Sequence, residues 1–377
     1  MVLKKTKENP LVWLYITPKD NLESIIKAVD SILIRLGYEI RTLVLSSEFN
    51  LFEVMESIII KNFKYDKEEL GQDIYSFKLY KKFRGRKKKE RASKFIIYKH
   101  SNPNIYILIT HENYTVFHKD ILSFINKFYP KIVKTYIDST NMKEIFHNLE
   151  EEIEEINIRI KILSTQSRIT NKEANKRYET GRKWTDISIN EMFQKVEEND
   201  EWIRSIDFTF TSRENSISEQ FKDFLNINCQ ISRNGVFKCD GKYAFFYSVI
   251  VNYSIKKAIK DLNLLSNRQR IKEEKYKSKP IVIEYKYDLF KDVSQNKRLI
   301  EVLQKIPFSS LSVSHSNPYL NCSYVDFKDG SSYDIWILSN NEITIIPQMR
   351  STYASLERLN HHIFIGLREG TIKEYSM

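Results

Sequence analysis

Hydrophobic and polar positions near the start of the chain follow the periods of a strand, a helix and a second strand. The apolar run 11–17 predicts a buried strand. Apolar side chains with a helical period over 22–36 predict a helix that begins near Asp20 and ends at Gly37. The run 38–45 predicts the second strand, and strands joined in this way usually form a parallel pair with the helix packed across them.

The same kind of pattern continues up to residue 163. It predicts helices over 51–63, 116–128 and 141–152, with N-caps at Asn50 and Asn141, and strands over 74–83, 94–100, 105–110 and 156–162. The strands 74–83 and 94–100 would pair as a hairpin. We therefore expect an N-terminal α/β domain over 1–163, with a β-α-β start and a mixed sheet that contains a hairpin over 74–100.

The apolar pattern weakens between residues 164 and 200, which predicts a basic polar linker with a short helix over 189–196. Beyond the linker, the order strand, helix, antiparallel strands, helix occurs twice. The predicted strands are 206–210, 229–233, 236–239, 243–251, 281–287, 310–314, 320–327, 333–338 and 343–346, and the predicted helices are 217–225, 254–265, 296–306 and 353–365. One hairpin turns on Asn234-Gly235, a preferred type I′ pair. We expect an α+β half over 201–377, with two similar modules over 204–275 and 280–366.

The composition is that of a basic globular protein. Of the 377 residues, 41% are hydrophobic, and 60 Lys+Arg outnumber 49 Asp+Glu to give a formal net charge of +11. Such a surplus favours attraction to nucleic acid or to an anionic membrane. The chain has nine glycines and contains neither G-x-x-x-x-G-K-[ST] nor G-x-G-x-x-G, which argues against an NTPase or a nicotinamide-dependent enzyme.

The cysteines and the N-terminal sequence indicate a compartment. Cys229, Cys239 and Cys322 form neither a CxxC motif nor a Cys/His metal spacing, and their small, odd number predicts buried thiols in a reducing environment. The first residues lack the apolar core of a signal peptide, and no apolar run reaches the ~18 residues that a membrane helix needs. We expect a cytoplasmic protein that has no membrane partner and no cofactor.

The densest charge cluster lies at the tip of the hairpin predicted over 74–100. Between residues 81 and 94 there are nine cations against one acid, Glu90, and the cations are Lys81, Lys82, Arg84, Arg86, Lys87, Lys88, Lys89, Arg91 and Lys94. Each cation that meets a phosphate releases a counterion, so this cluster predicts salt-sensitive affinity for a polyanion. The alternative is a solvated loop without a ligand. Phe83 and Phe95 flank the cluster and would either stack on bases or join the core.

Two further basic segments are candidates for the same ligand. The linker carries Arg182 and Lys183, and the helix predicted over 254–265 carries Lys256, Lys257 and Lys260. Because the apolar side chains of that helix would face the core, we expect the three lysines on its outer side. A solvated face without a ligand is the simpler interpretation of these lysines.

Catalytic and metal candidates are sparse. Glu284 and Lys286 lie two apart on a predicted strand and would point to the same face, as in the E-x-K half of a metal-dependent nuclease site. No upstream aspartate completes that site convincingly. Asp326 and Asp334 flank the turn at Asp329-Gly330 and are candidates for a Mg²⁺ pair. The seven histidines show no catalytic or metal spacing, so we expect structural roles for them.

These observations favour a nucleic-acid-binding protein, for DNA or RNA, that acts through phosphate contacts. The composition also suggests an accessory component of a prokaryotic antiviral-defence or mobile-element system. A metal-dependent nuclease that uses Glu284 and Lys286 is the enzymatic alternative. A scaffold that binds a protein partner, with a charge that only keeps the chain in solution, is the third hypothesis.

Overall fold

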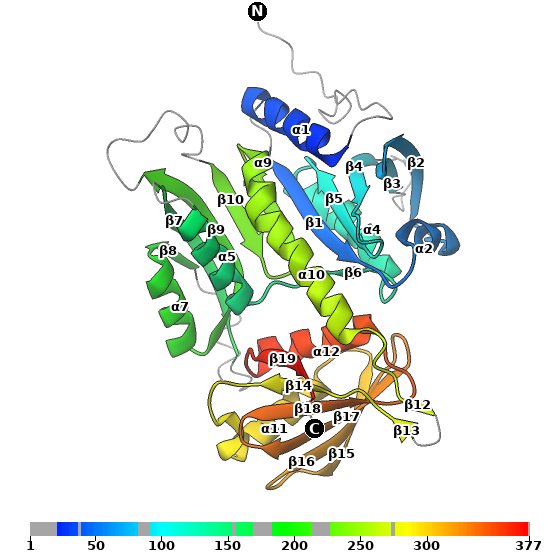
Figure 1. Ribbon diagram of the computed structural model, residues 1–377, viewed down its shortest axis with the longest axis vertical. Helices are drawn as coiled ribbons and strands as arrows, with labels where there is room; N and C mark the ends of the chain where they lie inside the picture. Colours follow the sequence, from blue (N-terminus) through cyan, green and yellow to red (C-terminus); the bar gives the residue numbers. More distant parts are fainter. Residues whose placement is uncertain are drawn as a thin grey trace, which may run out of the picture.

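Two sheets and the helices between them make up the molecule (Figure 1). The structure, a computed structural model, describes residues 21–36, 39–81, 91–152, 156–168, 183–212, 227–272 and 276–375. Helices and antiparallel sheets alternate along this chain, which confirms the expected α/β class.

The larger sheet has eleven strands and is called the large sheet below. Its members are β1 (Ile40–Ser46), β2 (Phe63–Gly71), β3 (Ile74–Lys81), β4 (Arg91–Lys99), β5 (Ile105–Thr110), β6 (Val133–Lys134), β7 (Ile156–Ser167), β8 (Lys183–Ile187), β9 (Glu201–Ser212), β10 (Asn228–Ser232) and β11 (Val236–Asp240). The order is β2-β3-β4-β5-β1-β11-β10-β9-β7-β8, and β6 pairs with β1. The sheet therefore joins strands from both sides of the linker predicted over 164–200.

Helices cover both faces of the large sheet. One face carries α1 (Leu22–Leu36), α5 (Ser139–Glu152), α7 (Ile189–Glu198), α9 (Tyr243–Phe246), η4 (Tyr247–Val251) and α10 (Asn252–Leu265). The other carries α2 (Leu51–Ser57), α3 (Tyr114–Val116), η2 (Phe117–Leu122), α4 (Ser123–Ile125) and η3 (Asn126–Phe128). Alternation along β1 explains the two cores, because Ile40 and Val44 enter the first and Leu43 and Leu45 the second.

The C-terminal part forms a six-stranded sheet, called the small sheet. It contains β14 (Ile281–Glu284), β15 (Ser309–His315), β16 (Leu320–Asp326), β17 (Ser331–Ser339), β18 (Glu342–Pro347) and β19 (Thr371–Glu374), in the order β15-β16-β17-β18-β14-β19. Its helices are η5 (Leu289–Lys291), α11 (Ser294–Gln304) and α12 (Tyr353–Gly366), and a separate two-stranded ribbon pairs β12 (Ile271–Lys272) with β13 (Tyr276–Lys277).

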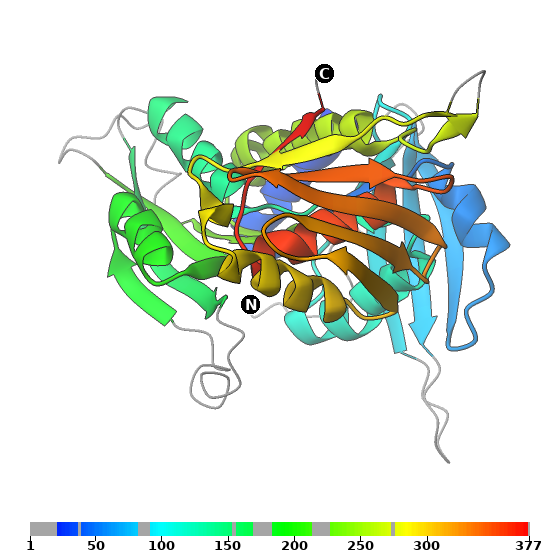
Figure 2. The same ribbon diagram turned by 90° about the horizontal axis from the view of Figure 1, so that it is seen from below.

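Helix α12 lies between the small sheet and the rest of the molecule (Figures 1 and 2). Its apolar side chains belong to the core of the small sheet. At its start, the hydroxyl of Ser46 on β1 donates to the hydroxyl of Tyr353 over 3.1 Å, and Tyr129 donates to the carbonyl of Ala354. Every residue from Tyr353 to Asn360 is buried, including the polar ones, so the polar groups of α12 must find partners inside the protein.

Several elements predicted from the sequence are confirmed. The helix expected over 22–36 is α1, and the helix expected over 353–365 is α12. The hairpin predicted on Asn234-Gly235 is β10–β11, and Gly235 has a φ of 69°, as a type I′ turn requires. Local turn chemistry and helical period were sufficient at these places.

Three local predictions are wrong. The segment 243–251, predicted as a strand, is helical and continues into α10, because a short apolar run does not distinguish a buried helix from a strand. The helix predicted over 51–63 ends at Ser57, and Phe63 begins β2, whose polar sequence lacks a strand pattern. The N-cap is not Asn141: α5 begins at Ser139, and the backbone N–H of Asn141 donates to the carboxylate of Asp138 over 2.8 Å.

The predicted β-α-β start is not confirmed. Its first strand, 11–17, lies outside the described residues, and its second strand is β1, which pairs antiparallel with β5, β6 and β11. The helix predicted over 217–225 also lies outside the described residues. In the described part of the chain, no helix combines the length and the apolar character needed to span a membrane.

Candidate functional site

The basic hairpin predicted over 74–100 is the pair β3–β4. Lys81 lies directly opposite Arg91 in this pair, and Lys78 lies opposite Lys94. Like charges opposite one another destabilise a sheet, and two acids offset them here. The ammonium of Lys81 lies 2.9 Å from the carboxylate of Asp120, and Asp66 on β2 is the cross-strand partner of Lys78.

Most of the predicted cluster lies in the connection between β3 and β4. Lys82, Arg84, Arg86, Lys87, Lys88 and Lys89 lie outside the described residues, and Arg91 is described for its backbone. Phe95, at the edge of the cluster, is buried and stacks on Phe77 with ring centres 5.1 Å apart, so it belongs to the core. In the linker, Arg182 lies outside the described residues, and Lys183 begins β8.

The hairpin and α10 lie on opposite faces of the large sheet. Lys81 contacts the carbonyl of Lys119 and the carboxylate of Asp120, both on η2, which covers one face. Helix α10 covers the other face. Lys81 and the lysines of α10 therefore do not line one groove.

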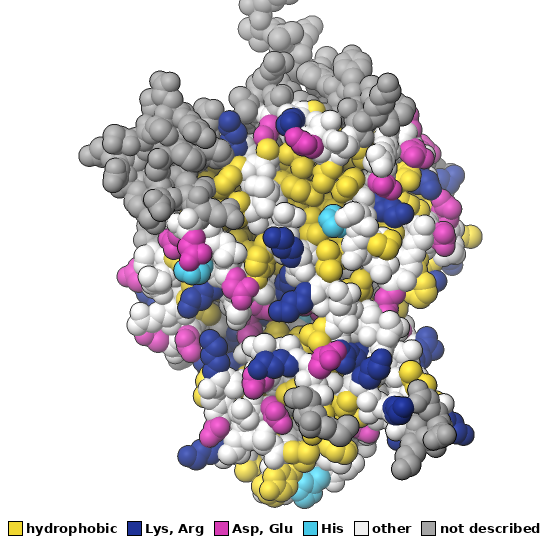
Figure 3. Space-filling model, in the orientation of Figure 1, with side chains coloured by type: hydrophobic (Ala, Val, Ile, Leu, Met, Phe, Trp, Pro, Cys, Tyr) yellow, Lys and Arg dark blue, Asp and Glu magenta, His cyan; other side chains and the backbone are white. Residues whose placement is uncertain are grey.

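A polar cleft of about 460 Å³ opens beside α10, where the large-sheet body meets the small-sheet body. We call it the junction cleft. Its walls come from α5, α10, α12 and the segment that leads into β19, with Arg233 from the β10–β11 turn. Figure 3 shows this face of the molecule, with Lys and Arg side chains over its middle and a hollow between the two bodies.

Three lysines from the sequence prediction line the junction cleft, but they are not equivalent. Lys256 and Lys260 are exposed, as expected. Lys257 is a correction: it forms an ion pair with Asp261 one turn along α10, and its side chain is 14% exposed. Burial alone would lower the pKa of Lys257, but Asp261, Glu357 and Asp138 together raise it above its ordinary value. The helix has a second buried side because α12 packs near it.

Two buried carboxyl groups lie at the floor of the junction cleft. Burial, with repulsion from Asp261, raises the pKa of Glu357 to about 8. Burial, with the nearby Glu369 carboxylate, raises the pKa of Asp138 to about 6. At neutral pH, Glu357 is therefore mostly protonated and able to donate a hydrogen bond, whereas Asp138 is mostly ionised.

Other buried polar atoms at the junction cleft lack partners. Asn360 on α12 is 2% exposed, and neither atom of its side-chain amide forms a hydrogen bond with a described residue. The Nε of Arg233 is also without a hydrogen-bond partner within the described ranges. Beside them, the rings of Tyr136 and His361 stack with centres 3.8 Å apart, and burial lowers the pKa of His361 well below its ordinary value.

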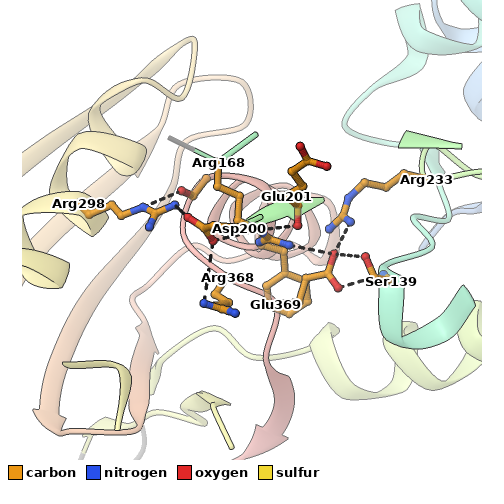
Figure 4. Close-up of polar contacts among 10 residues, drawn as sticks. Ser139, Arg168, Asp200, Glu201, Arg233, Arg298, Arg368 and Glu369 are labelled. Atoms are coloured by element: carbon orange, nitrogen blue, oxygen red, sulfur yellow. Dashed lines mark hydrogen bonds and ion pairs between the residues drawn. The ribbon is translucent and has the colours of Figure 1, made fainter. Parts of the chain in front are cut away.

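A smaller cavity of about 240 Å³, called the side cavity, lies on the other side of residues Thr140, Gly370 and Thr371, which line both spaces. A buried network of charges borders it (Figure 4). Glu369 accepts hydrogen bonds from Ser139 and from the guanidinium of Arg233, and lies 3.7 Å from the guanidinium of Arg168.

The same network continues to Asp200, which ties the two bodies together. The carboxylate of Asp200 lies 2.9 Å from Arg298 on α11, 3.9 Å from Arg168 and 4.0 Å from Arg368. Residues of the large-sheet body are thus linked by charge to α11 and to the chain after α12. Sequence patterns did not identify this network, because its members are separated by up to about 230 residues and share no spacing.

Glu284 and Lys286, the predicted E-x-K pair, both line the side cavity. β14 ends at Glu284, whose carboxylate forms an ion pair with Lys373 on β19, and Lys286 is exposed. Within the described ranges, no three histidine, cysteine or acidic side chains are grouped so that they would hold a metal ion. A nuclease site at Glu284 and Lys286 stays a prediction.

The Mg²⁺ pair predicted at Asp326 and Asp334 is wrong. Asp334 lies opposite Ser323 on β16, three residues from Asp326, so the two carboxylates point to opposite faces of the small sheet. Asp326 faces α12, where Arg358 and Ser355 bind it. Asp334 lies on the other face and accepts hydrogen bonds from Ser323 and Gln348.

Comparison with known proteins adds no assignment. No model of a known protein family matches the chain, and no curated protein matches it.

Proposed function

We propose that the protein binds nucleic acid through phosphate contacts made by the hairpin β3–β4 and the connection between its strands. One observation carries this proposal: the nine residues that connect Lys81 to Arg91 contain six cations and one acid. The acids nearest in the fold, Asp66 and Asp120, already lie against Lys78 and Lys81 at the base of the hairpin. The cations of the connection therefore remain for an external polyanion.

The position of the hairpin supports the same function. β2, β3 and β4 are the outermost strands at one end of the large sheet, so the connection between β3 and β4 extends from an edge region of the fold. The stacked rings of Phe77 and Phe95 fix the two strands to one another from within the core. A rigid base that carries many cations suits contacts with a charged backbone and requires no base recognition.

The test is the salt dependence of binding to a short DNA duplex and to an RNA duplex of the same sequence. Replacing Lys87, Lys88 and Lys89 by Ser should reduce the slope of log K against log salt by up to about 3, because each phosphate contact contributes about 0.9. The matched control replaces Lys291, Lys297 and Lys305, which are exposed on or beside α11, and should leave the slope unchanged. Equal effects of the two triple variants, or no binding at about 50 mM salt, would overturn the proposal.

A further inference from the structure

Asn360 is the starting point, because its buried amide faces the junction cleft without a partner. Helix α12 is enclosed from Tyr353 to Asn360, and the neighbouring polar residues on it are satisfied: Ser355 and Arg358 bind Asp326, and Glu357 accepts a hydrogen bond from the backbone of Tyr136. The amide of Asn360 has no such partner among the described residues, and a buried polar group left in this state reduces the stability of the fold. Such a group is best explained by a ligand that completes it.

The cleft around Asn360 has a polarity that selects one kind of ligand. Its mouth carries Lys256 and Lys260, which are exposed, lie one turn apart on α10 and form no ion pair with a described residue. Lys257, between them, is already neutralised by Asp261. Deeper in the cleft are the Asn360 amide, the carboxyl groups of the floor and aromatic rings. A ligand that fits has an anionic end at the mouth and an uncharged end with donors and acceptors inside.

We propose that the junction cleft binds a nucleotide, with its phosphate on Lys256 and Lys260 and the edge of its base on Asn360. An asparagine amide offers one acceptor and one donor side by side, which matches the paired donor and acceptor of a base edge such as that of adenine. The aromatic lining, with Tyr136, Tyr253 and Phe364, suits a flat ring. The volume of about 460 Å³ is within the range of small-molecule sites.

This site lies on the opposite face of the large sheet from Lys81, so it goes beyond the proposed function and is tested without it. The nucleotide has two sources with the same chemistry, a free nucleoside monophosphate or the 5′-phosphorylated end of a strand. In both cases the phosphate remains at the mouth and the base enters the cleft.

Calorimetric titration of the full chain with the four ribonucleoside 5′-monophosphates, their nucleosides and inorganic phosphate tests the proposal. At least one monophosphate should bind, and its nucleoside and phosphate alone should each bind about tenfold more weakly or less. The double variant K256S/K260S should weaken binding of that monophosphate by about tenfold and leave binding of the nucleoside unchanged. No binding of any monophosphate up to about 1 mM would overturn the proposal.

Asn360→Leu separates a binding role from a structural one. The leucine removes an amide that has no partner within the described residues, so the melting temperature should stay the same or rise, while affinity for both nucleotide and nucleoside falls by about tenfold. Unchanged affinity in Asn360→Leu, or a lower melting temperature with unchanged affinity, would overturn the assignment of this residue. The hairpin variant with Lys87, Lys88 and Lys89 replaced by Ser should bind the nucleotide normally, so failure of one site is distinguishable from failure of the other.

A 5′-phosphorylated tetranucleotide distinguishes the two sources. Competition with the best monophosphate at equal or higher affinity identifies a strand end as the ligand and supports the site. Exclusion of the tetranucleotide, with the monophosphate still bound, identifies a free nucleotide and supports the site as well. Equal competition by a tetranucleotide that lacks the 5′-phosphate would overturn the placement of the phosphate on Lys256 and Lys260.

Discussion

The carboxylate of Asp326 lies 2.7 Å from the guanidinium of Arg358, and both side chains are shielded from solvent. Asp326 ends β16 and Arg358 belongs to α12, so this ion pair joins the small sheet to the helix that separates it from the large sheet. Ser355 also donates to Asp326, over 3.2 Å. The acid that seemed suited to a metal is therefore fully engaged in holding the fold.

Asp326→Ala should destabilise the protein by about 3–5 kcal/mol, because it leaves the buried Arg358 guanidinium without its counter-charge. Urea unfolding followed by circular dichroism measures the loss. Asp334→Ala is the matched control on the other face of the sheet, where only Ser323 and Gln348 bind the acid, and should cost about 1 kcal/mol. Equal losses for the two variants would contradict the assignment of Asp326 as the structural acid.

Glu369→Gln should also destabilise the protein at neutral pH, by about 3–5 kcal/mol, because Arg168 and Arg233 both lie against this carboxylate in a buried place. Burial alone would raise the pKa of Glu369, but Arg233 and Arg168 lower it below its ordinary value. A carboxyl with a lowered pKa contributes stability above its unfolded-state pKa and loses it as the pH falls through the folded-state value. The difference between the wild type and Glu369→Gln should therefore shrink below about pH 4 in thermal melts.

The control for Glu369→Gln is Glu23→Gln on α1. Glu23 pairs with Lys27, but both side chains are about 70% exposed, so water and salt screen the pair. The melting temperature of Glu23→Gln should equal that of the wild type. A loss in Glu23→Gln as large as that in Glu369→Gln would mean that burial does not set the strength of these pairs.

Local signals in the sequence predicted elements but not the junction between the two sheets. The Asn234-Gly235 turn was predictable because the required φ is a property of two adjacent residues. The position of Lys257 was not, because the helical period locates the face toward the large sheet and contains nothing about α12 on another side. For the same reason, the sequence did not indicate Asn360, Glu357 or Glu369: each becomes a candidate only when a distant segment buries it.

Glu357→Gln should remove part of the pH dependence of stability. The pKa of Glu357 is raised from 4.5 to about 8, so the folded protein binds a proton that the unfolded chain releases. Between about pH 5 and pH 8 this group should therefore lower stability by about 1.4 kcal/mol for each unit of rising pH. Lys257, Asp261 and Asp138 face the same carboxyl and remain in the variant. Melting temperatures of wild type and Glu357→Gln across this range measure the difference, and parallel curves would contradict a buried, protonated Glu357.

Gly235→Ala should cost at least about 3 kcal/mol, more than the same change at another glycine with a positive φ. Gly235 has a φ of 69°, and a Cβ built there would overlap the backbone carbonyl oxygen of Thr135, which is held in place where β6 meets β1. Gly330 is the matched control: its φ is 79°, but a Cβ there would lie 3.5 Å from the nearest atom, on the flexible Arg350 side chain. Gly330→Ala should therefore cost only the backbone strain, about 1–2 kcal/mol. Urea unfolding of both variants measures the gap, and equal costs would show that the β10–β11 turn is free to move away from Thr135.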